Sequence, residues 1–466
     1  MNSISRRKFG KTMAMGAMGG LAAGSAVTIA EGQGAPAQTP KRMSDDNALA
    51  EISRGWDSDE RWKGIQRPYS AKDVVRLRGS IQIDHTLARM GAERLWQLVH
   101  TEPYVQMTAA TSGMQAVFMV QAGLKAINVS GNGVAAEGND AGDMYPDEGL
   151  YPVGSVPSVI RKINNSLRRA DQISHAAGQH DVDWMVPLKG DAEAGWGGDL
   201  NAFEVMKSMI KAGAATVSFE DQPASTKKCG HFGGKVLVPT REHIRKLIAA
   251  RLAADVLGVP TLVIARTDAK DSPLISTDID PRDQPFLTGK RTSEGFFRTR
   301  GGLDAVIARS LAYAPFADML WFETNEPSLE EARKFAEAIH AKFADKLLYY
   351  NCSSSFNWSK VLDDASIARF QAEIGTMGYK IQNCTGVGIN SMYLSLFKTV
   401  RRYRETGMPA LASVQQEQRD AIKDGYKGWK SQEFVGAEYF DDVAETIAGA
   451  ALSTGAMSGS TEESQF

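Results

Sequence analysis

The sequence predicts an α/β protein built around a (β/α)8 TIM-type barrel, with extra helices before and after the barrel. From about residue 103 onward, short apolar segments alternate with longer amphipathic ones, which is typical of repeated βα units. Polar or charged residues directly follow almost every apolar segment. Because the carboxyl ends of all barrel strands meet at one face, where the loops form the active site, this pattern also predicts an enzyme.

Eight apolar segments are the predicted strands. They span residues 104–111, 126–130, 183–189, 215–219, 261–265, 319–322, 347–350 and 379–384. Helical periodicity occupies the connections, most clearly at residues 241–257 and 329–343. We assign residues 103–400 to the catalytic barrel, 38–102 to an N-terminal helical segment and 401–466 to C-terminal helices and a tail.

The first 37 residues have the pattern of a twin-arginine (Tat) signal peptide. Residues 5–9 read SRRKF, residues 12–30 are small and uncharged, and residues 35–37 read APA, which suits cleavage. We expect a periplasmic or otherwise extracytoplasmic protein, and a cytoplasmic one if the signal is not used. Cell fractionation tests this expectation, because finding only the uncleaved chain in the cytosol would contradict export.

Overall composition excludes several classes of function. The 466 residues carry a net charge of −2, from 53 basic and 55 acidic side chains, so neither a nucleic-acid partner nor stable membrane insertion is expected. Glycine and alanine dominate the signal segment, which is too weakly hydrophobic for a transmembrane anchor. Three cysteines, at positions 229, 352 and 384, do not make a disulfide framework.

Residues 227–235, which read KKCGHFGGK, form the stretch richest in potential chemistry. Three glycines predict a loop whose backbone comes close to a ligand. The neighbouring lysines and His231 should lower the pKa of the Cys229 thiol, so that it exchanges a proton near neutral pH. The alternative is a basic surface loop with an incidental cysteine. Glu220 and Asp221, which follow a strand just before the loop, favour the catalytic interpretation.

Acidic residues after the strands predict a metal site. The set comprises Asp147, Asp191, Glu193, Glu220 and, less strongly, Glu323. Facing carboxylates repel one another unless a cation joins them, and oxygen ligands suit Mg²⁺, with Mn²⁺ as the other possibility. Mg²⁺ favours few direct carboxylates, so we expect Asp191 to bind it and the others to hold metal-bound waters. The alternative is a salt-bridge network with Arg266 and the lysines.

Anion-binding residues are predicted to face these acids. Arg266, His231 and the hydroxyl-rich segment 351–358 (NCSSSFNW) offer donors for a substrate carboxylate. The serines alternatively form a turn and helix cap, and both roles are compatible because helix N-termini bind anions. A metal, a carboxylate pocket and a thiol between them indicate chemistry through an enolate-like intermediate.

These motifs resemble those of the isocitrate lyase family. Residues 227–235 are similar to its K-K-C-G-H-[ML]-G-G-K motif, and the likeness extends from about residue 50 to the terminal SGSTEESQF. The resemblance implies Mg²⁺-dependent retro-aldol cleavage of isocitrate, a tricarboxylate, to glyoxylate and succinate, as in the glyoxylate cycle. It also implies a homotetramer whose subunits exchange C-terminal helices, for which residues 415–439 are the candidate segment.

The resemblance also implies roles for individual residues. Cys229 would be the general acid that protonates the succinate carbanion, on a loop that closes over the substrate together with the C-terminal tail. His231, Arg266 and Glu323 would complete the catalytic set. The implied substrate-binding residues are Ser130, Gly131, Gly230, Asn351, Ser353, Ser355 and Thr385. The implied metal site is Asp191, surrounded by Asp147, Glu193 and Glu220.

The sequence departs from the family on one side of the site. Asn128 and Asn132 stand where the family has Tyr and Trp, and Ser218 replaces a His. Gly386 replaces a Leu, which we expect to remove bulk beside Thr385 and to favour a substituted substrate. Asn and Ser cannot act as general bases at neutral pH, and losing two aromatic rings enlarges the pocket. Isocitrate is the default substrate. The alternatives are a lyase for 2-methylisocitrate or another substituted 2-hydroxy acid, and a catalytically weak extracytoplasmic dicarboxylate-binding protein.

Overall fold

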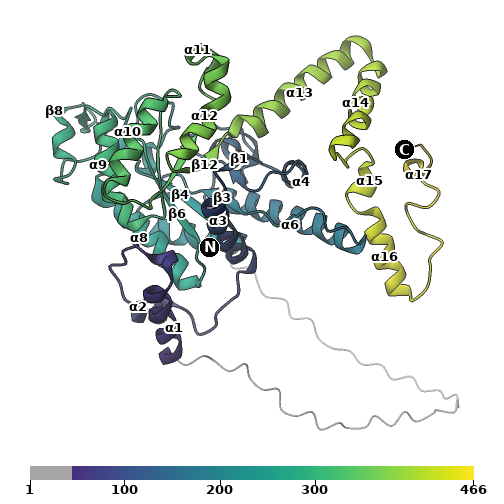
Figure 1. Cartoon of the computed structure of the whole chain (residues 1–466), viewed down its shortest axis with the longest axis horizontal. Coiled ribbons are helices and arrows are strands. Elements are labelled where there is room, and N and C mark those ends of the chain that lie inside the picture. The colour runs from purple at the N-terminus through teal and green to yellow at the C-terminus, as the bar shows by residue number, and fades with distance from the viewer. Residues whose placement is uncertain (1–44, 466) are drawn as a thin grey trace, which may run out of the picture. The chain divides into compact units, whose positions relative to one another are not determined.

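A computed structural model describes residues 45–465, which belong to one compact unit. Eight parallel strands close into a barrel in the order β1-β12-β11-β10-β6-β4-β3-β2, which confirms the predicted fold class (Figure 1). The strands are β1 (Val105–Ala109), β2 (Ile127–Val129), β3 (Leu188–Asp191), β4 (Thr216–Glu220), β6 (Leu262–Thr267), β10 (Met319–Phe322), β11 (Leu347–Asn351) and β12 (Tyr379–Asn383). The predicted signal peptide, residues 1–37, lies outside the described residues.

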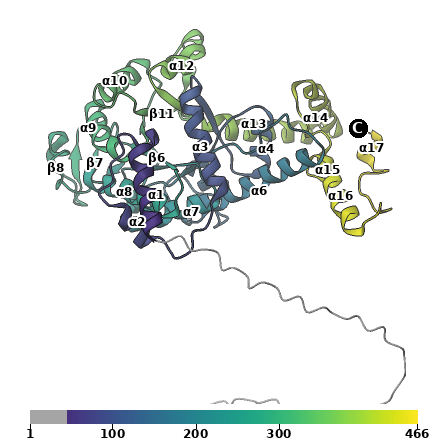
Figure 2. The ribbon, with the colours of Figure 1, turned by 60° about the horizontal axis from the view of Figure 1, so that its bottom comes forward.

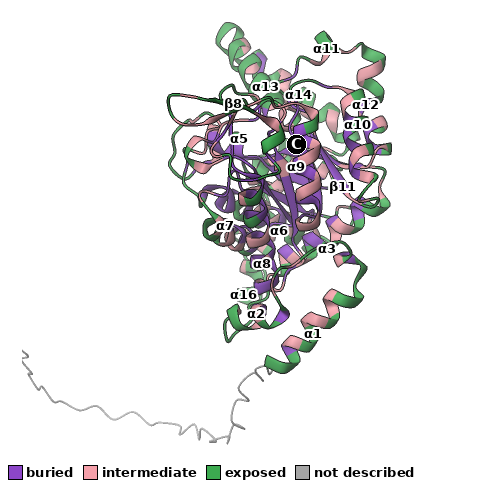
Figure 3. Cartoon of the chain, turned by 90° about the vertical axis from the view of Figure 1, so that its left-hand side faces the viewer, coloured by how far each residue is buried: buried purple, intermediate pink, exposed green. Residues whose placement is uncertain are grey.

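Helices occupy the connections between barrel strands, as expected. They are α4 (Gly113–Gln121), α6 (Ser155–Ala176), α7 (Asp199–Ala212), α8 (Thr240–Leu257), α9 (Leu303–Tyr313), α10 (Leu329–His340) and α12 (Asp364–Thr376). Helices α8 and α10 confirm the two helices predicted from periodicity. Figure 3 shows the buried residues concentrated in the barrel strands and on the helix faces that pack against them.

Further helices precede and follow the barrel. The N-terminal ones are α1 (Asp45–Ser58), α2 (Ala71–Leu77) and α3 (Thr86–Thr101), and the C-terminal ones are α13 (Thr385–Thr406), α14 (Met408–Asp420), α15 (Ser431–Phe434), α16 (Ala437–Ala448) and α17 (Thr461–Gln465). Helix α3 packs its apolar face into the barrel interior at the amino-terminal ends of the strands (Figure 2). Among the described residues, we find no helix with the length and apolar character needed to span a bilayer.

Strand β3 begins later than predicted and also extends further. The predicted segment was 183–189, but pairing starts at Leu188, directly after Pro187, and continues to Asp191. Proline has no N–H to give to a strand ladder, so the pairing cannot include it as a donor. Because side chains alternate along a strand, Lys189 and Asp191 face the same side, toward the barrel interior.

A second, four-stranded sheet was not predicted. It comprises β5 (Val236–Leu237), β7 (Leu274–Ile275), β8 (Leu287–Arg291) and β9 (Phe297–Thr299), in the order β5-β7-β9-β8. Two of these strands have only two residues, which is too short for a periodic pattern in the sequence. Since β5 directly follows Lys235, this sheet anchors the carboxyl end of the 227–235 loop.

A buried carboxylate ties the N-terminal segment to the barrel. Asp318, which immediately precedes β10, accepts hydrogen bonds from Arg61 Nη1 (2.6 Å) and the backbone N–H of Val263 (2.6 Å), and it pairs with Arg251. Burial acts to raise the pKa of Asp318, but the two arginines outweigh burial and hold it well below its ordinary value. The carboxylate therefore stays ionised and compensates two buried cations.

Replacing Asp318 with Asn should lower the free energy of unfolding by about 3–5 kcal/mol, because two buried guanidinium groups lose their compensating charge. Urea denaturation followed by tryptophan fluorescence measures this loss. As a control, Lys334→Ala removes an exposed ion pair with Glu330, whose two side chains are 60% and 75% exposed. That variant should stay within about 0.5 kcal/mol of the wild type. Equal unfolding curves for all three proteins would contradict the assigned role of Asp318.

Candidate active site

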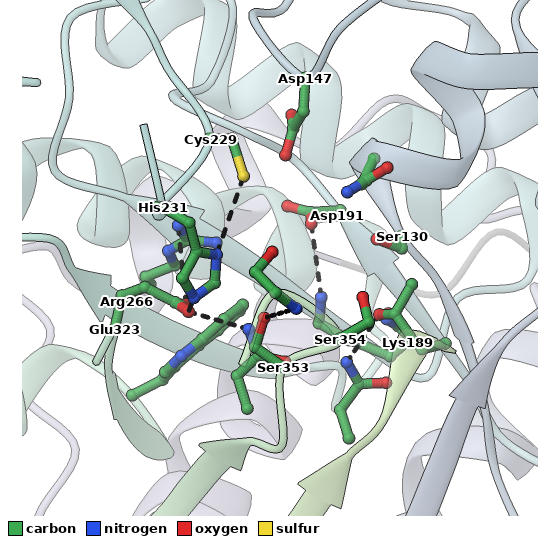
Figure 4. Close-up of a pocket in the computed structure, with 18 residues that line it drawn as sticks. Ser130, Asp147, Lys189, Asp191, Cys229, His231, Arg266, Glu323, Ser353 and Ser354 are labelled. Carbon is green, nitrogen blue, oxygen red and sulfur yellow. Dashed lines mark hydrogen bonds and ion pairs between the residues drawn. The ribbon is translucent and has the colours of Figure 1, made fainter. Parts of the chain in front are cut away.

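A pocket lies at the carboxyl ends of the barrel strands, and it gathers most of the predicted site residues (Figure 4). The predicted residues that line it are Ser130, Asp147, Asp191, Cys229, Gly230, His231, Arg266, Glu323, Asn351, Ser353, Ser355 and Thr385. The remaining three, Gly131, Glu193 and Glu220, do not line it but contact residues that do. Ser354, from the predicted segment 351–358, also lines it, as do three side chains that sequence reasoning did not select, namely Lys189, Trp321 and Asn383.

Lys227 lies among three of the carboxylates predicted to surround a metal. Its ammonium forms ion pairs with Asp147 and Glu193, and it lies 3.6 Å from Glu220 Oε1. Burial acts to lower the pKa of Lys227, but these three acids raise it well above its ordinary value. The salt-bridge network considered as an alternative to a metal is therefore present around these side chains.

Asp191 faces the pocket from the end of β3. Its Oδ1 accepts from the N–H of Glu193 (3.2 Å) and from Ser218 Oγ (3.3 Å), and its Oδ2 accepts from the N–H of Gly131 (3.3 Å). Burial acts to raise the pKa of Asp191, whereas Lys189 and nearby cations lower it, and the net shift is downward. The ionised carboxylate is held in place by three weak donors and stays accessible to a ligand.

The neighbouring glutamates show that burial and nearby acids disfavour further negative charge in the cluster. Burial, followed by the charge of Asp147, raises the pKa of Glu193 to about 7, and burial raises that of Glu220 well above its ordinary value. Both carboxylate oxygens of Glu220 lack a hydrogen-bond partner. Within residues 45–465, no three His, Cys, Asp or Glu side chains form a ready-made metal cage. An all-oxygen set with unused acceptors nevertheless fits a hard divalent cation that keeps its own waters.

The predicted lowering of the Cys229 pKa is wrong. Burial, with Asp147, raises the pKa of the thiol to about 12, although its Sγ lies 3.9 Å from His231 Nδ1. The lysines expected to lower it are engaged elsewhere, since Lys227 pairs with the acid cluster and Lys235 Nζ donates to a backbone carbonyl at 2.6 Å. The thiol is therefore protonated at neutral pH, which is the state that a proton donor requires.

Gly230 brings the backbone of the loop against the anion-binding side of the pocket. Its carbonyl accepts from Lys235 Nζ at 2.6 Å, which fixes the loop. A Cβ at this position would lie 2.5 Å from both Arg266 Nη2 and Glu323 Cγ. This close approach agrees with the prediction made from the glycine content of the loop.

Arg266, His231 and Glu323 form one connected group beside Cys229. Glu323 Oε1 lies 3.2 Å from His231 Nε2 and accepts from Asn351 Nδ2 at 2.9 Å, while its Oε2 lies 3.7 Å from Arg266 Nη2. Burial acts to lower the pKa of His231, but the carboxylate of Glu323 outweighs burial and raises it. Two cationic side chains are thus presented to the pocket, as binding of a carboxylate substrate requires.

The serine-rich loop after β11 serves as both a turn and a pocket wall. Ser353 Oγ accepts from the backbone N–H of Ser355 at 3.0 Å, and both residues line the pocket together with Ser354. The expectation that Gly386 frees space beside Thr385 is wrong. A Cβ at Gly386 would lie 2.7 Å from Ser354 Cβ, so that space is already filled.

The missed pocket residues share a position in the sequence that marks them. Lys189, Trp321 and Asn383 each lie two residues before a selected residue at or just beyond the carboxyl end of their strand, and Asn128 precedes Ser130 in the same way. Because side chains of a strand alternate with a period of two, such residues face the same interior one step deeper. A spacing of two residues before each selected strand-end residue could therefore have identified these pocket residues from the sequence.

Comparison with known proteins gives a consistent set of matches. A sequence model of the isocitrate lyase family matches residues 48–290 and 289–466. Isocitrate lyase of Halalkalibacterium halodurans is 56% identical over 415 residues, covering 89% of this chain and 97% of that protein. The Escherichia coli isocitrate lyase is 54% identical over 428 residues, covering 90% and 98%. Isocitrate lyase 1 of Mycobacterium tuberculosis is 52% identical over 417 residues, covering 89% and 97%.

Solved structures at low sequence identity share the fold. A complex of oxaloacetate acetylhydrolase with 3,3-difluorooxalacetate matches with a TM-score of 0.55 and 22% identity, covering 77% of this chain and 97% of that one. A 2,3-dimethylmalate lyase, described as a member of the PEP mutase/isocitrate lyase superfamily, matches with a TM-score of 0.53 and 20% identity, covering 79% and 98%. These similarities support the barrel architecture.

Proposed function

The chain belongs to the isocitrate lyase family, and on that basis we propose that it cleaves isocitrate to glyoxylate and succinate by a metal-dependent retro-aldol reaction. Membership of this family identifies the chain as a carbon–carbon lyase of the isocitrate lyase type. The observation that carries the substrate proposal is the convergence of Asp191, Cys229 and Arg266 in one pocket (Figure 4). An acid cluster that can hold a metal, a proton donor for the carbanion and an anion binder are three of the groups that such a cleavage needs, beside a base that accepts the proton of the 2-hydroxyl group.

We propose Mg²⁺ as the metal, with Mn²⁺ able to replace it. Asp191 would hold the ion directly, while Asp147, Glu193 and Glu220 would hold its waters. When bound, the ion supplies Lewis-acid stabilisation of the oxygen on the carbon that becomes the aldehyde. Lys227 keeps the surrounding carboxylates partly neutralised, which keeps them together in the buried cluster.

Cys229 is the proposed general acid. Its raised pKa keeps the proton on sulfur until a strongly basic carbanion forms in the succinate half. After the transfer, the thiolate would lie beside His231, whose positive charge is favoured by Glu323. A neighbouring cation stabilises a thiolate.

The proposed carboxylate pocket for the succinate half uses the opposite wall. Asn351, Ser353, Ser355 and Thr385 line it, and Thr385 is the first residue of α13. The free N–H groups at the start of a long helix favour an anion. Hydroxyl and amide donors next to them fix the orientation of a carboxylate.

Purified protein with Mg²⁺ should release glyoxylate from isocitrate, and EDTA should abolish that release. Cys229→Ser should lower kcat by about 10²–10⁴-fold, because a serine hydroxyl is a much weaker acid than a thiol. Cys384→Ser is the matched control, since Cys384 does not line the pocket, and it should retain activity. A spectrophotometric assay of the released 2-oxo acid measures each rate, and full activity of Cys229→Ser would contradict the proposal.

The same assay separates the alternative substrates. Asn128 and Asn132 line the pocket, and this observation keeps a bulkier 2-hydroxy acid as the second candidate. Pyruvate released from 2-methylisocitrate, with no glyoxylate from isocitrate, would favour that candidate. Binding of dicarboxylates without turnover of either compound would favour the binding-protein alternative, against which the position of Cys229 argues.

We also propose a homotetramer that exchanges C-terminal helices. Helix α13 exposes an apolar stripe at i, i+3, i+4 and i+7 spacing, in which Leu396 is 61%, Phe397 63% and Val400 55% exposed. The tail contacts α15 of its own chain, where Glu462 accepts from the N–H of Gln432 at 3.0 Å. Closure over the pocket by this tail therefore stays a prediction, as does export through residues 1–37.

Introducing a charge into the α13 stripe should disrupt the assembly, because large exposed apolar faces mark subunit contacts. Phe397→Asp should shift the mass measured by light scattering from about four chains toward one or two. Lys398→Asp, on the same exposed helix, controls for the new charge and should leave the mass unchanged. A monomeric wild type would contradict the tetramer outright.

A further inference from the structure

Lys189 is a buried cation for which the lyase reaction described above provides no role. It lies on β3, between β2 and β4, and it lines the pocket with 0% of its side chain exposed (Figure 4). In the strand register, Asn128 of β2 and Thr216 of β4 are opposite Lys189, and Ser218 of β4 is opposite Asp191. Short side chains therefore flank this lysine on both neighbouring strands.

The ammonium of Lys189 has no hydrogen-bond partner among the described residues. Asp191 Oδ2 lies 3.8 Å away, beyond hydrogen-bond distance, and its oxygens already accept from other donors. The ring centroids of Trp321 and Tyr349 lie 5.3 and 5.8 Å from Nζ. Aromatic faces stabilise a buried cation only in part, so three N–H groups remain unused at the floor of a polar pocket.

Trp321 links this lysine to the second cation of the pocket. The guanidinium carbon of Arg266 lies 4.5 Å from the Trp321 ring centroid, and the indole Nε1 is itself without a partner. Arg266 already donates to Asp268 through Nε (3.0 Å) and Nη2 (3.1 Å). Arg266 therefore has part of its guanidinium committed to Asp268, whereas the Lys189 ammonium and the Trp321 indole N–H have no hydrogen-bond partner among the described residues.

We propose that Lys189 is a specificity-determining residue that binds a carboxylate of the substrate at the floor of the pocket. The inference rests on the proposed lyase function and names the residue that recognises the half released as a 2-oxo acid. That half is assigned here because Asp191, the proposed metal ligand, lies two residues further along the same face of β3. Asn128 leaves room for this contact, because its short side chain replaces a ring at the position opposite Lys189.

A purely local role is the alternative that the structure also suggests. Lys189 would then act only as the counter-ion of Asp191, from which it is 3.8 Å distant. Its removal would change the affinity for Mg²⁺ while leaving the affinity of the Mg²⁺-saturated protein for carboxylates unchanged. The affinity of the Mg²⁺-saturated protein for a carboxylate therefore distinguishes the two roles, and measuring it requires no turnover.

The test uses Lys189→Met, which keeps length and apolar packing but removes the charge and the donors. Glyoxylate and succinate are titrated separately, by calorimetry, into the full-length Mg²⁺-saturated wild type and variant. Glyoxylate affinity should fall at least about tenfold, the effect expected for a lost hydrogen bond to a charged group. Succinate affinity should stay within about twofold, and this provides the internal control.

Lys189→Gln tests the same contact in case the methionine variant does not fold, as judged by circular dichroism. The amide keeps a donor without the charge, so its glyoxylate affinity should lie between those of wild type and Lys189→Met. Unchanged glyoxylate affinity in either folded variant, equal loss of glyoxylate and succinate, or no glyoxylate binding by the wild type would overturn the inference. Failure of the lyase assay with isocitrate is a separate result, because these titrations involve no catalysis.

Discussion

Charge compensation among buried side chains at the carboxyl ends of the strands is the constraint on which the site depends. Six acidic side chains, Asp147, Asp191, Glu193, Glu220, Asp268 and Glu323, face four basic ones, Lys189, Lys227, Lys235 and Arg266. The acids outnumber these cations by two, and the raised pKa values of Glu193 and Glu220 mean that bound protons relieve part of this excess, which a divalent cation would otherwise neutralise. Uncompensated charge is costly away from water, so the cations are structural requirements of this cluster as much as chemical groups.

The barrel places these charges, and a second buried network holds the loops that carry them. Asp221, directly after β4, accepts from Arg309 Nη1 (2.9 Å), Tyr313 OH (3.0 Å) and Thr267 Oγ1 (2.6 Å). These partners belong to α9 and β6, so one carboxylate joins two consecutive βα units of the fold, β4–α8 and β6–α9. The loop 227–235 leaves from this point and returns through β5, which leaves its glycine-rich centre free to approach Arg266 and Glu323.

Local pattern was sufficient to predict the barrel and most of its functional face. Each strand had its own apolar segment, and each strand end had its own polar residue, so neither inference needed knowledge of distant contacts. The burial of individual side chains, and its effect on their pKa values, could not be predicted from local sequence pattern. The pKa of Cys229 depends on Asp147 and on the loss of water around the sulfur, whereas neighbours in sequence suggested the opposite shift. Likewise, the space beside Gly386 is filled by Ser354, which is distant in sequence, so the sequence around Gly386 could not show it.

Two of the altered residues, Asn128 and Ser218, lie in barrel strands at a depth below the proposed site, and this indicates how chemistry and specificity can vary separately. Asn128 and Ser218 each precede a residue of the proposed site, Ser130 and Glu220, by two positions on their own strand. Two residues of a strand span about 6–7 Å, so each altered side chain lies one layer below the residues that carry the chemistry. Lys189 lies on β3, between these two strands and two positions before Asp191. Its side chain lines the pocket at the same depth as Asn128. Substitutions at these deeper strand positions can therefore change which carboxylate fits the pocket, while the acid cluster and the Cys229 thiol keep their positions.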